Sequence, residues 1–311
     1  MKTASLLLLI CTTLSAWNSV GHKAIAGLAY DLLNDKARAR VDSLIQQHPD
    51  FALLAEGGPA EEKAKLRYAF MKAAFWPDII KGDLRFYDDG KRDATATATK
   101  PGFPEMKQHR DWHYINIPFS TDGTETVNPR DPNVLSQILW IRPLLAGEAS
   151  PGQAKDPVYL LPWFLHLVGD VHQPLHCATR FKRDQVNPQT GKPWSDLGGN
   201  TVNVVGSYNL HAYWDDALGI TDTDVFVNGV VKVMAKRAGA GTEVLDASKW
   251  VDEGLELARS FVYSFGNEGG GKENPIQLTD EYRVQSRRIA LERAAIGARR
   301  LAAILNAELG N

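Results

Sequence analysis

The sequence contains little cysteine and no long apolar run. Cys11 and Cys177 are its only cysteines among 311 residues, so a cysteine-rich structural zinc site is excluded. No stretch after the N-terminal segment is long and apolar enough to span a bilayer, so we expect no membrane insertion. The formal net charge of -2 excludes a polycation that coats nucleic acid. An anionic substrate would have to be attracted locally, and bound metal ions could do this.

The first sixteen residues have the pattern of a secretory signal. Lys2 precedes a short apolar stretch, and Ser15 and Ala16 are small residues suited to cleavage. We therefore expect a signal peptide at 1–16, one domain at 17–311, and a secreted or periplasmic protein, with a buried N-terminal helix as the alternative. Cleavage would remove Cys11 and leave no intrachain disulfide, so bound metal ions are a candidate source of stability.

The rest of the chain predicts an all-α fold, a single mostly helical domain with long loops and a short β-hairpin. Apolar residues recur at helical spacing through most of it. We expect polar loops at 86–108 and 181–200 and a short strand at 201–205. The arginines between 283 and 300 could form a nucleic-acid patch, but a solvated helix face is the better interpretation. The helical segments expected are 22–47, 61–75, 133–146, 157–171, 209–218, 223–237, 246–264 and 279–308.

The most informative segment is 166–176, which reads His-Leu-Val-Gly-Asp-Val-His-Gln-Pro-Leu-His. His166 and Asp170 are four residues apart, so they lie one above the other on a helix face. Pro174 cannot continue that helix, and we expect the helix to end just before it. A turn there can bring His176 back toward the same point, so the segment offers three metal ligands.

A second pair with the same spacing follows, His211 and Asp215. Two ionisable pairs on apolar helices need partners, and imidazole with carboxylate suits zinc and leaves room for more than one ion. Three of the remaining histidines are not expected to bind metal. We expect His48 and His109 at the surface and His172 in a packing role.

Three further segments offer a donor next to an aromatic residue. His22 follows Trp17 by five residues, and a Trp17 freed by cleavage could chelate a metal through its amino group and carbonyl oxygen. Asp78 follows Trp-Pro at a helix end, where its carboxylate can point into a site. His113 lies between Trp112 and a tyrosine. Cys177, next to a histidine, is better explained as a small buried residue than as a ligand.

Taken in order, these motifs resemble the zinc-dependent, single-strand-specific nucleases of fungi, plants and bacteria, called type I nucleases. The resemblance spans roughly residues 17–220 and implies a fold like that of phospholipase C and these nucleases. The matching motifs are Trp17…Gly21-His22, Trp76-Pro-Asp78, Trp112-His113-Tyr-Ile, His166-x3-Asp170-x5-His176, Gly198-Gly-Asn200 and Asn209-Leu-His211-x3-Asp215.

The resemblance implies three zinc ions per chain and hydrolysis of single-stranded RNA and DNA to 5′-phosphorylated products, with 3′-nucleotides as further substrates. Zinc would acidify the attacking water. We expect a monomer. By match, one zinc takes Asp78, His113, His166 and Asp170; a second takes the Trp17 amino and carbonyl groups, His22 and Asp170; and a third takes His176, His211 and Asp215.

Two catalytic positions depart from the fungal pattern. Lys81 and Asn116 stand where fungal relatives carry arginine and aspartate. Asn116 can orient water but cannot accept a proton, and Lys81 is a point charge rather than a fork. The resemblance implies substrate contacts at Tyr114 and Asn200, although a core tyrosine is an equally good interpretation of Tyr114.

Two alternatives stay open at this stage. Zinc-dependent phospholipases C have the same trinuclear arrangement, but they typically end the last motif with Glu, where this chain has Asp215, and they lack the Gly198-Gly-Asn200 motif. A purely structural zinc protein is the other alternative. Structural sites are coordinatively closed and usually contain several cysteines, which this chain does not offer.

Overall fold

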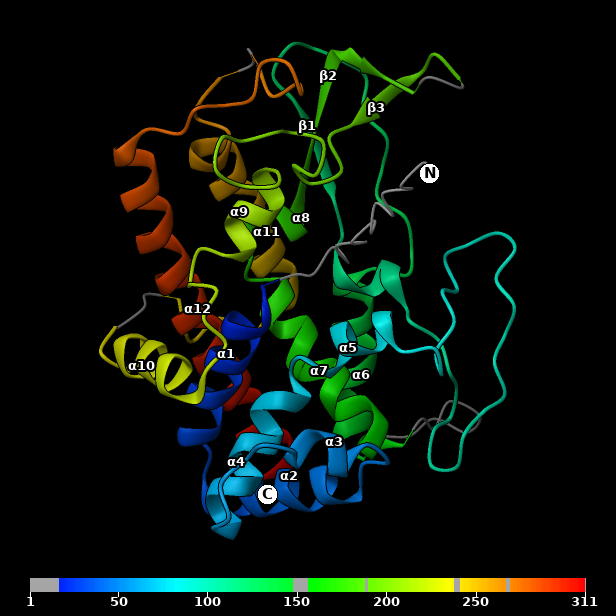
Figure 1. The fold of residues 1–311 in the computed structure, drawn as a ribbon, viewed down its shortest axis with the longest axis vertical. Helices are drawn as coiled ribbons and strands as arrows, with labels where there is room; N and C mark the ends of the chain where they lie inside the picture. The colour runs from blue at the N-terminus through cyan, green and yellow to red at the C-terminus, as the bar shows by residue number, and fades with distance from the viewer. Residues whose placement is uncertain (1–16, 148–155, 188–189, 238–240, 267–268, 311) are drawn as a thin grey trace, which may run out of the picture.

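The computed structural model describes residues 17–147, 156–187, 190–237, 241–266 and 269–310, so the expected signal segment lies outside it. Helices dominate the described chain, as predicted (Figure 1). They are α1 (Ser19–Asp31), α2 (Asp35–Gln47), α3 (Phe51–Ala55), α4 (Glu62–Ala73), α5 (Trp76–Ile79), α6 (Val134–Leu145), α7 (Pro157–Asp170), α8 (Pro174–Cys177), α9 (Leu210–Asp215), α10 (Asp224–Ala235), α11 (Ala247–Leu257) and α12 (Asp280–Leu309), with the short 3₁₀ helices η1 (Ile80–Gly82) and η2 (Arg110–His113) and the π-helix η3 (Ala258–Val262).

Helix α7 runs through the centre of the molecule and packs against α1, α2, α4, α5, α6 and α12 (Figure 1). Every side chain from Val158 to Asp170 is buried. Asp156 caps the helix by accepting a hydrogen bond from the Val158 amide, and Pro157 occupies its first turn, where its missing N–H costs nothing. Polar groups at the far end of α7 therefore have to find partners inside the protein.

The predicted helical segment 22–47 forms two helices. Helix α1 ends at Asp31, and the Asn34 side chain then accepts a hydrogen bond from the Ala37 amide and caps α2. The long helix α12 lies along α1 and also contacts α7 and α2 (Figure 1). Within the described residues, no helix combines the length and the apolar composition needed to cross a membrane.

A small sheet covers one end of the helical core. Strand β1 (Ile117–Ser120) pairs in parallel with β2 (Ala178–Val186), and β2 pairs antiparallel with β3 (Pro193–Ser195). The expected hairpin is therefore present, but it lies at 178–195, largely within the segment 181–200 that was predicted as a polar loop. The strand predicted at 201–205 is wrong: only Val204 forms a bridge, to Ile276, between turns at Gly199 and Gly206 that both have positive φ.

Two histidines predicted at the surface are buried. His48 is 2 % exposed; its Nδ1 accepts a hydrogen bond from the Asp50 amide, and its ring lies edge-on to Trp76. His109 is 6 % exposed and stacks on Trp112. The local sequence is polar in both cases, but aromatic residues from other segments, Trp76 for His48 and Trp163 for His109, also cover these rings.

The arginines of α12 divide into two kinds. Arg287 and Arg288 are exposed, as a solvated face predicts. Arg293 and Arg300 are buried instead, and both pair with Glu253 of α11, at 2.6 and 2.7 Å. For these two residues the prediction is wrong, because both pair with a single acidic residue on another helix.

Candidate metal centre

The end of α7 points two of the predicted ligands into the core. His166 and Asp170 lie on one face of the helix, with His166 Nε2 3.1 Å from Asp170 Oδ2. The helix stops at Asp170, and Gln173 then caps the one-turn helix α8, where Pro174 takes the first position. This turn brings His176 back into the interior, but it groups with His211 and Asp215 rather than with His166 and Asp170.

Helix α1 approaches this end of α7 because two glycines allow it. A Cβ at Gly169 would lie 2.9 Å from His22 Nδ1, and a Cβ at Gly21 would lie 2.7 Å from Trp17 Cβ. The Trp17 indole is buried and donates to the Gly169 carbonyl at 3.0 Å. Trp17 is therefore held directly beside the end of α7, next to His22.

Eight predicted ligand side chains come together in three buried groups whose donor atoms lie within 4.8 Å of one another. Asp170 connects two of the groups, because Oδ1 lies 3.2 Å from His22 Nε2 and Oδ2 lies 3.1 Å from His113 Nδ1. His166 belongs to both of these groups, one more than the sequence assigned. The groups are His22, His166 and Asp170; Asp78, His113 and His166; and His176, His211 and Asp215.

The geometry of the third group suits a bound cation. His211 Nδ1 lies 2.7 Å from the Gly198 carbonyl, and His176 Nδ1 bonds to the His113 carbonyl. A carbonyl only accepts, so each Nδ1 carries the proton and each Nε2 presents a lone pair. The two Nε2 atoms lie 3.1 Å apart. Two imidazoles bound to one tetrahedral zinc at about 2.0–2.1 Å place their nitrogens roughly 3.3 Å apart.

Burial keeps these imidazoles neutral. It lowers the pKa of His166 and of His211 to about 4, and burial together with the His211 charge lowers the pKa of His176 well below 6.5. Burial raises the pKa of Asp170 to about 7 and that of Asp215 well above 3.8. Neutral imidazoles and desolvated carboxylates are good ligands for a divalent cation.

Within the described residues, several buried polar atoms of the centre make no hydrogen bond. They include His22 Nε2, Asp78 Oδ2 and Asp170 Oδ1. Buried acceptors without a donor cost free energy unless something else satisfies them. The residues present therefore fit metal ions. Their imidazole and carboxylate ligand atoms suit zinc. Cys177 is buried against α11 and does not face the groups.

The two predicted catalytic residues lie at the edge of the centre. Lys81 is 7 % exposed, and its Nζ lies 2.6 Å from Asp78 Oδ1. Burial alone would raise the pKa of Asp78, but the charges of Lys81, His166 and His22 lower it overall. Asn116 has a left-handed backbone (φ +56°) and lines a cavity of about 410 Å³. Its backbone amide, like that of Ile115, hydrogen-bonds to the His176 carbonyl, so the cavity adjoins the third group through these two residues. We call this the proximal cavity.

The predicted substrate contacts have different surroundings. Tyr114 is half-buried, lines the proximal cavity and donates through its hydroxyl to Asp111 Oδ1 at 2.9 Å. It is thus no core tyrosine. The Asn200 amide bonds within the chain, donating to the Leu197 carbonyl at 2.7 Å and accepting from Asn209 at 3.4 Å. In this structure its contacts shape the loop that precedes α9.

Sequence reasoning missed two residues that orient ligands. Gln173 Nε2 donates to Asp215 Oδ1 at 2.8 Å. Asp196, fully buried, accepts from the Gly199 amide at 3.1 Å and so holds the loop whose Gly198 carbonyl orients His211. Their positions in the sequence could have indicated both residues. Gln173 lies inside the His-Asp-His motif, and Asp196 precedes the paired glycines by two residues.

Comparison with known proteins agrees with these observations. The model of the S1/P1 nuclease family matches residues 17–310. Among curated proteins, Endonuclease 2 of Arabidopsis thaliana is 30 % identical over 334 residues, covering 98 % of this chain and 94 % of the relative. Endonuclease 5 of the same plant is 25 % identical, covering 93 % of this chain and 89 % of the relative. The chain belongs to the S1/P1 nuclease family.

Proposed function

We propose that this nuclease is a zinc-dependent phosphodiesterase that cleaves single-stranded RNA and DNA to 5′-phosphorylated products and also removes phosphate from 3′-nucleotides. The observation that carries the proposal is the set of three buried His and Asp groups with facing lone pairs and unpartnered carboxylate oxygens. A structural zinc protein is disfavoured by the family, and a phospholipase C by the same match to nucleases.

The ligand assignment proposed is the one that the sequence predicted. Asp78, His113 and His166 would hold one zinc together with Asp170; Asp170 would also serve a second zinc with His22 and the Trp17 amino and carbonyl groups. His176, His211 and Asp215 would hold the third. The buried Trp17, fixed beside Gly169, supports a chelating N-terminus after cleavage at 16. This processing, with a secreted or periplasmic and monomeric product, is part of the proposal.

Bound zinc would supply Lewis acidity at the phosphate and an acidified water. The chain's own residues would then position the reactants. Lys81 is fixed on Asp78 and adds one positive charge at the phosphate. Asn116 faces the proximal cavity and can orient a water by hydrogen bonding, but it cannot take the proton. Tyr114 offers a ring on which a base can stack.

The preference for single strands follows from burial. All eight ligand side chains belong to residues that are at most 6 % exposed. A phosphate inside a duplex could not reach such a recessed centre without distortion, whereas a single strand can bend inward and place an unstacked base in the adjacent cavity.

The decisive experiment combines metal analysis of the exported protein with N-terminal sequencing. We expect three zinc ions per chain and Trp17 as the first residue. The same preparation, assayed on single-stranded RNA and on phosphatidylcholine, should hydrolyse only the RNA, and activity should disappear after chelation. A chain that begins elsewhere, holds no zinc or keeps cutting RNA after thorough chelation would refute the proposal.

A further inference from the structure

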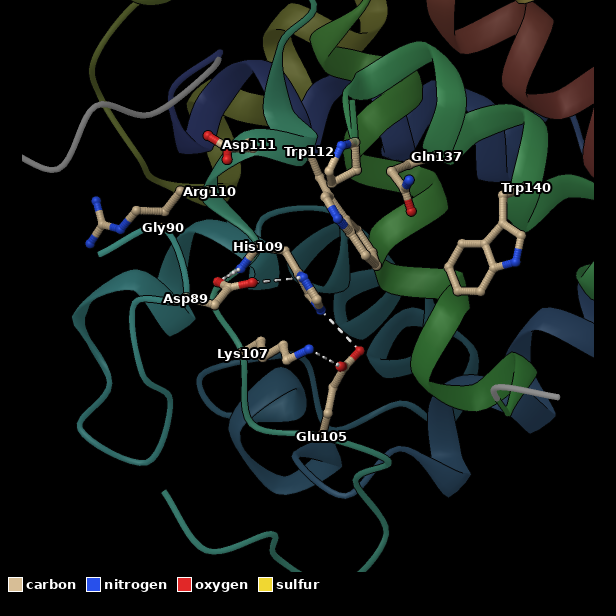
Figure 2. Close-up of a pocket in the computed structure, with 11 residues that line it drawn as sticks. Asp89, Gly90, Glu105, Lys107, His109, Arg110, Asp111, Trp112, Gln137 and Trp140 are labelled. Carbon is tan, nitrogen blue, oxygen red and sulfur yellow. Dashed lines mark hydrogen bonds and ion pairs between the residues drawn. The ribbon is translucent and has the colours of Figure 1, made fainter. Parts of the chain in front are cut away.

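We propose that a second cavity of about 550 Å³ binds a base further along the strand that is cut at the metal centre. We call it the distal cavity, and Figure 2 shows its lining. This inference rests on the proposed function. It assigns to the protein a second nucleotide subsite, made by residues of α6, η2 and the loops before each of them. None of these residues belongs to the three His and Asp groups.

The two cavities adjoin each other. Asp111 and Pro132 line both of them. Asp111 also accepts the hydrogen bond from the Tyr114 hydroxyl at 2.9 Å, so the residue between the cavities fixes the ring at the proximal cavity. A strand whose base stacks on Tyr114 can therefore continue past Asp111 into the distal cavity without leaving the surface.

The walls of the distal cavity suit a flat, uncharged ring. Trp112 and Trp140 have ring centroids 5.9 Å apart and meet at 75°, which forms an aromatic corner (Figure 2). Trp112 cannot swing away, because it stacks on the His109 ring at 3.7 Å and lies 4.9 Å from the Trp163 ring. Gln137 lies next to this corner and carries both a donor and an acceptor for a base edge (Figure 2).

The charges in the distal cavity favour a base over a phosphate. Three carboxylates line it, and two of them hold His109: Glu105 Oε1 lies 2.9 Å from Nε2, and Asp89 Oδ2 lies 3.3 Å from Nδ1. Two cations also line the cavity, and both are paired with acids: Lys107 lies 3.5 Å from Glu105, and Arg110 Nε lies 3.0 Å from Asp88 Oδ2. An internucleotide phosphate, which carries one negative charge, would be repelled by these carboxylates at close range. A neutral base would not be repelled, and its exocyclic amino groups could donate to them.

A cation lies where the strand's phosphates would pass. Arg130 is exposed, lines the proximal cavity and stands two residues before Pro132, which borders both cavities. Its guanidinium also acts electrostatically on the Tyr114 hydroxyl. The expected arrangement is thus a base on Tyr114, a phosphate near Arg130 and a second base against Trp140.

The test is the dependence of cleavage on substrate length. The wild-type, zinc-loaded enzyme should show a higher kcat/KM on a single strand of about eight nucleotides, within the footprint of ~4–16 nucleotides known for single-strand binding sites, than on a dinucleotide too short to fill both cavities. Trp140→Ala should lower kcat/KM on the long substrate by about tenfold, the effect of losing one base–aromatic stack, and should leave the dinucleotide unchanged.

Leu139→Ala is the matched control, because Leu139 is the preceding residue of α6, is 55 % exposed and does not line the cavity. It should change neither rate. Trp140→Phe should restore most of the length dependence. If Trp140→Ala proves unfolded by circular dichroism, Gln137→Ala serves in its place with the same expected pattern.

The outcomes separate the two proposals. Equal kcat/KM of the wild type on both substrates, or an equal loss on both for the Trp140→Ala variant, overturns the distal subsite and leaves the nuclease proposal intact. A wild type that cleaves neither substrate with zinc bound overturns the proposed function, and the distal subsite with it.

Discussion

Replacement of Asp170 by asparagine should make the metal-free protein more stable than the wild type and the metal-loaded protein less stable than the wild type. One Asp170 carboxylate oxygen lies 3.2 Å from His22 Nε2, and the other lies 3.1 Å from both His113 Nδ1 and His166 Nε2. Asparagine keeps the shape of the side chain and removes its charge. The fully buried carboxylate should therefore matter in opposite ways with and without cations.

The size of the metal-free effect follows from the pKa. Burial raises the pKa of Asp170 from 3.8 to about 7. The folded state then binds a proton more readily than the unfolded state, so this residue lowers stability as the pH rises from 3.8 to 7, and the full cost remains above pH 7. That cost is roughly 4 kcal/mol. An asparagine side chain does not ionise and would not incur it, so the metal-free Asp170→Asn variant should be more stable than the wild type by about this amount at pH 8, and equally stable below pH 4.

With zinc the order should reverse. Two of the three groups lose their shared anion, so the metal content should fall from three ions to one, held by His176, His211 and Asp215. The assays are urea unfolding at pH 8 in chelator and in excess zinc, with metal analysis after gel filtration. His211→Ala is the control: it should lose one ion and leave the Asp170 groups filled. A metal-free Asp170→Asn variant that is less stable than the wild type, or one that retains three ions, would refute this reasoning.

Three further substitutions test the surrounding structure. Gly198→Ala should lower stability by roughly 2 kcal/mol and reduce third-site zinc, because φ is +64° and the new Cβ would lie 2.6 Å from the Leu175 carbonyl oxygen; calorimetry and metal analysis check this. Burial lowers the pKa of His48 to about 4 from 6.5, so the unfolded chain binds a proton there more readily than the folded protein. The free energy of unfolding therefore falls as the pH drops from 6.5 to 4. Between pH 7 and pH 5 the free energy of unfolding of the His48→Gln variant, measured in urea, should therefore fall by about 2 kcal/mol less than that of the wild type. An equal fall in both proteins would contradict the burial. Glu253→Gln should cost roughly 3 kcal/mol, because it leaves Arg300 charged and buried without its acid, while the zinc content stays at three.

Local rules in the sequence predicted the helices well. The helices expected at 133–146 and 157–171 begin at Val134 and Pro157, and Asn133 and Asp156 cap them through their side chains. The four-residue spacing in His166/Asp170 placed both side chains on one face, because that rule depends only on helix geometry. The order and approximate bounds of the long helices followed for the same reason.

Burial that depends on partners far along the chain could not be predicted this way. His109 lies between Gln108 and Arg110, close to Lys107, which indicates a surface loop. Its ring is nevertheless covered by Trp163 of α7 and held by Asp89, 20 residues earlier. Arg300 is fully buried because Glu253, 47 residues earlier, meets it from another helix. Neither pairing leaves a periodic trace in the sequence.

The ligand atoms that destabilise the metal-free fold are the same atoms through which bound ions would stabilise it. Burial raises the pKa of both Asp170 and Asp215, which means that each ionised carboxylate destabilises the metal-free fold. The facing lone pairs of His176 and His211 add to that cost. An ion bound to the native state relieves these terms together, and the unfolded chain does not offer the same groups at the same distances. Stability should therefore rise with the logarithm of free zinc concentration, and the helix ends that carry the ligands, at α1, α7 and α9, should be the first to open when zinc is withdrawn.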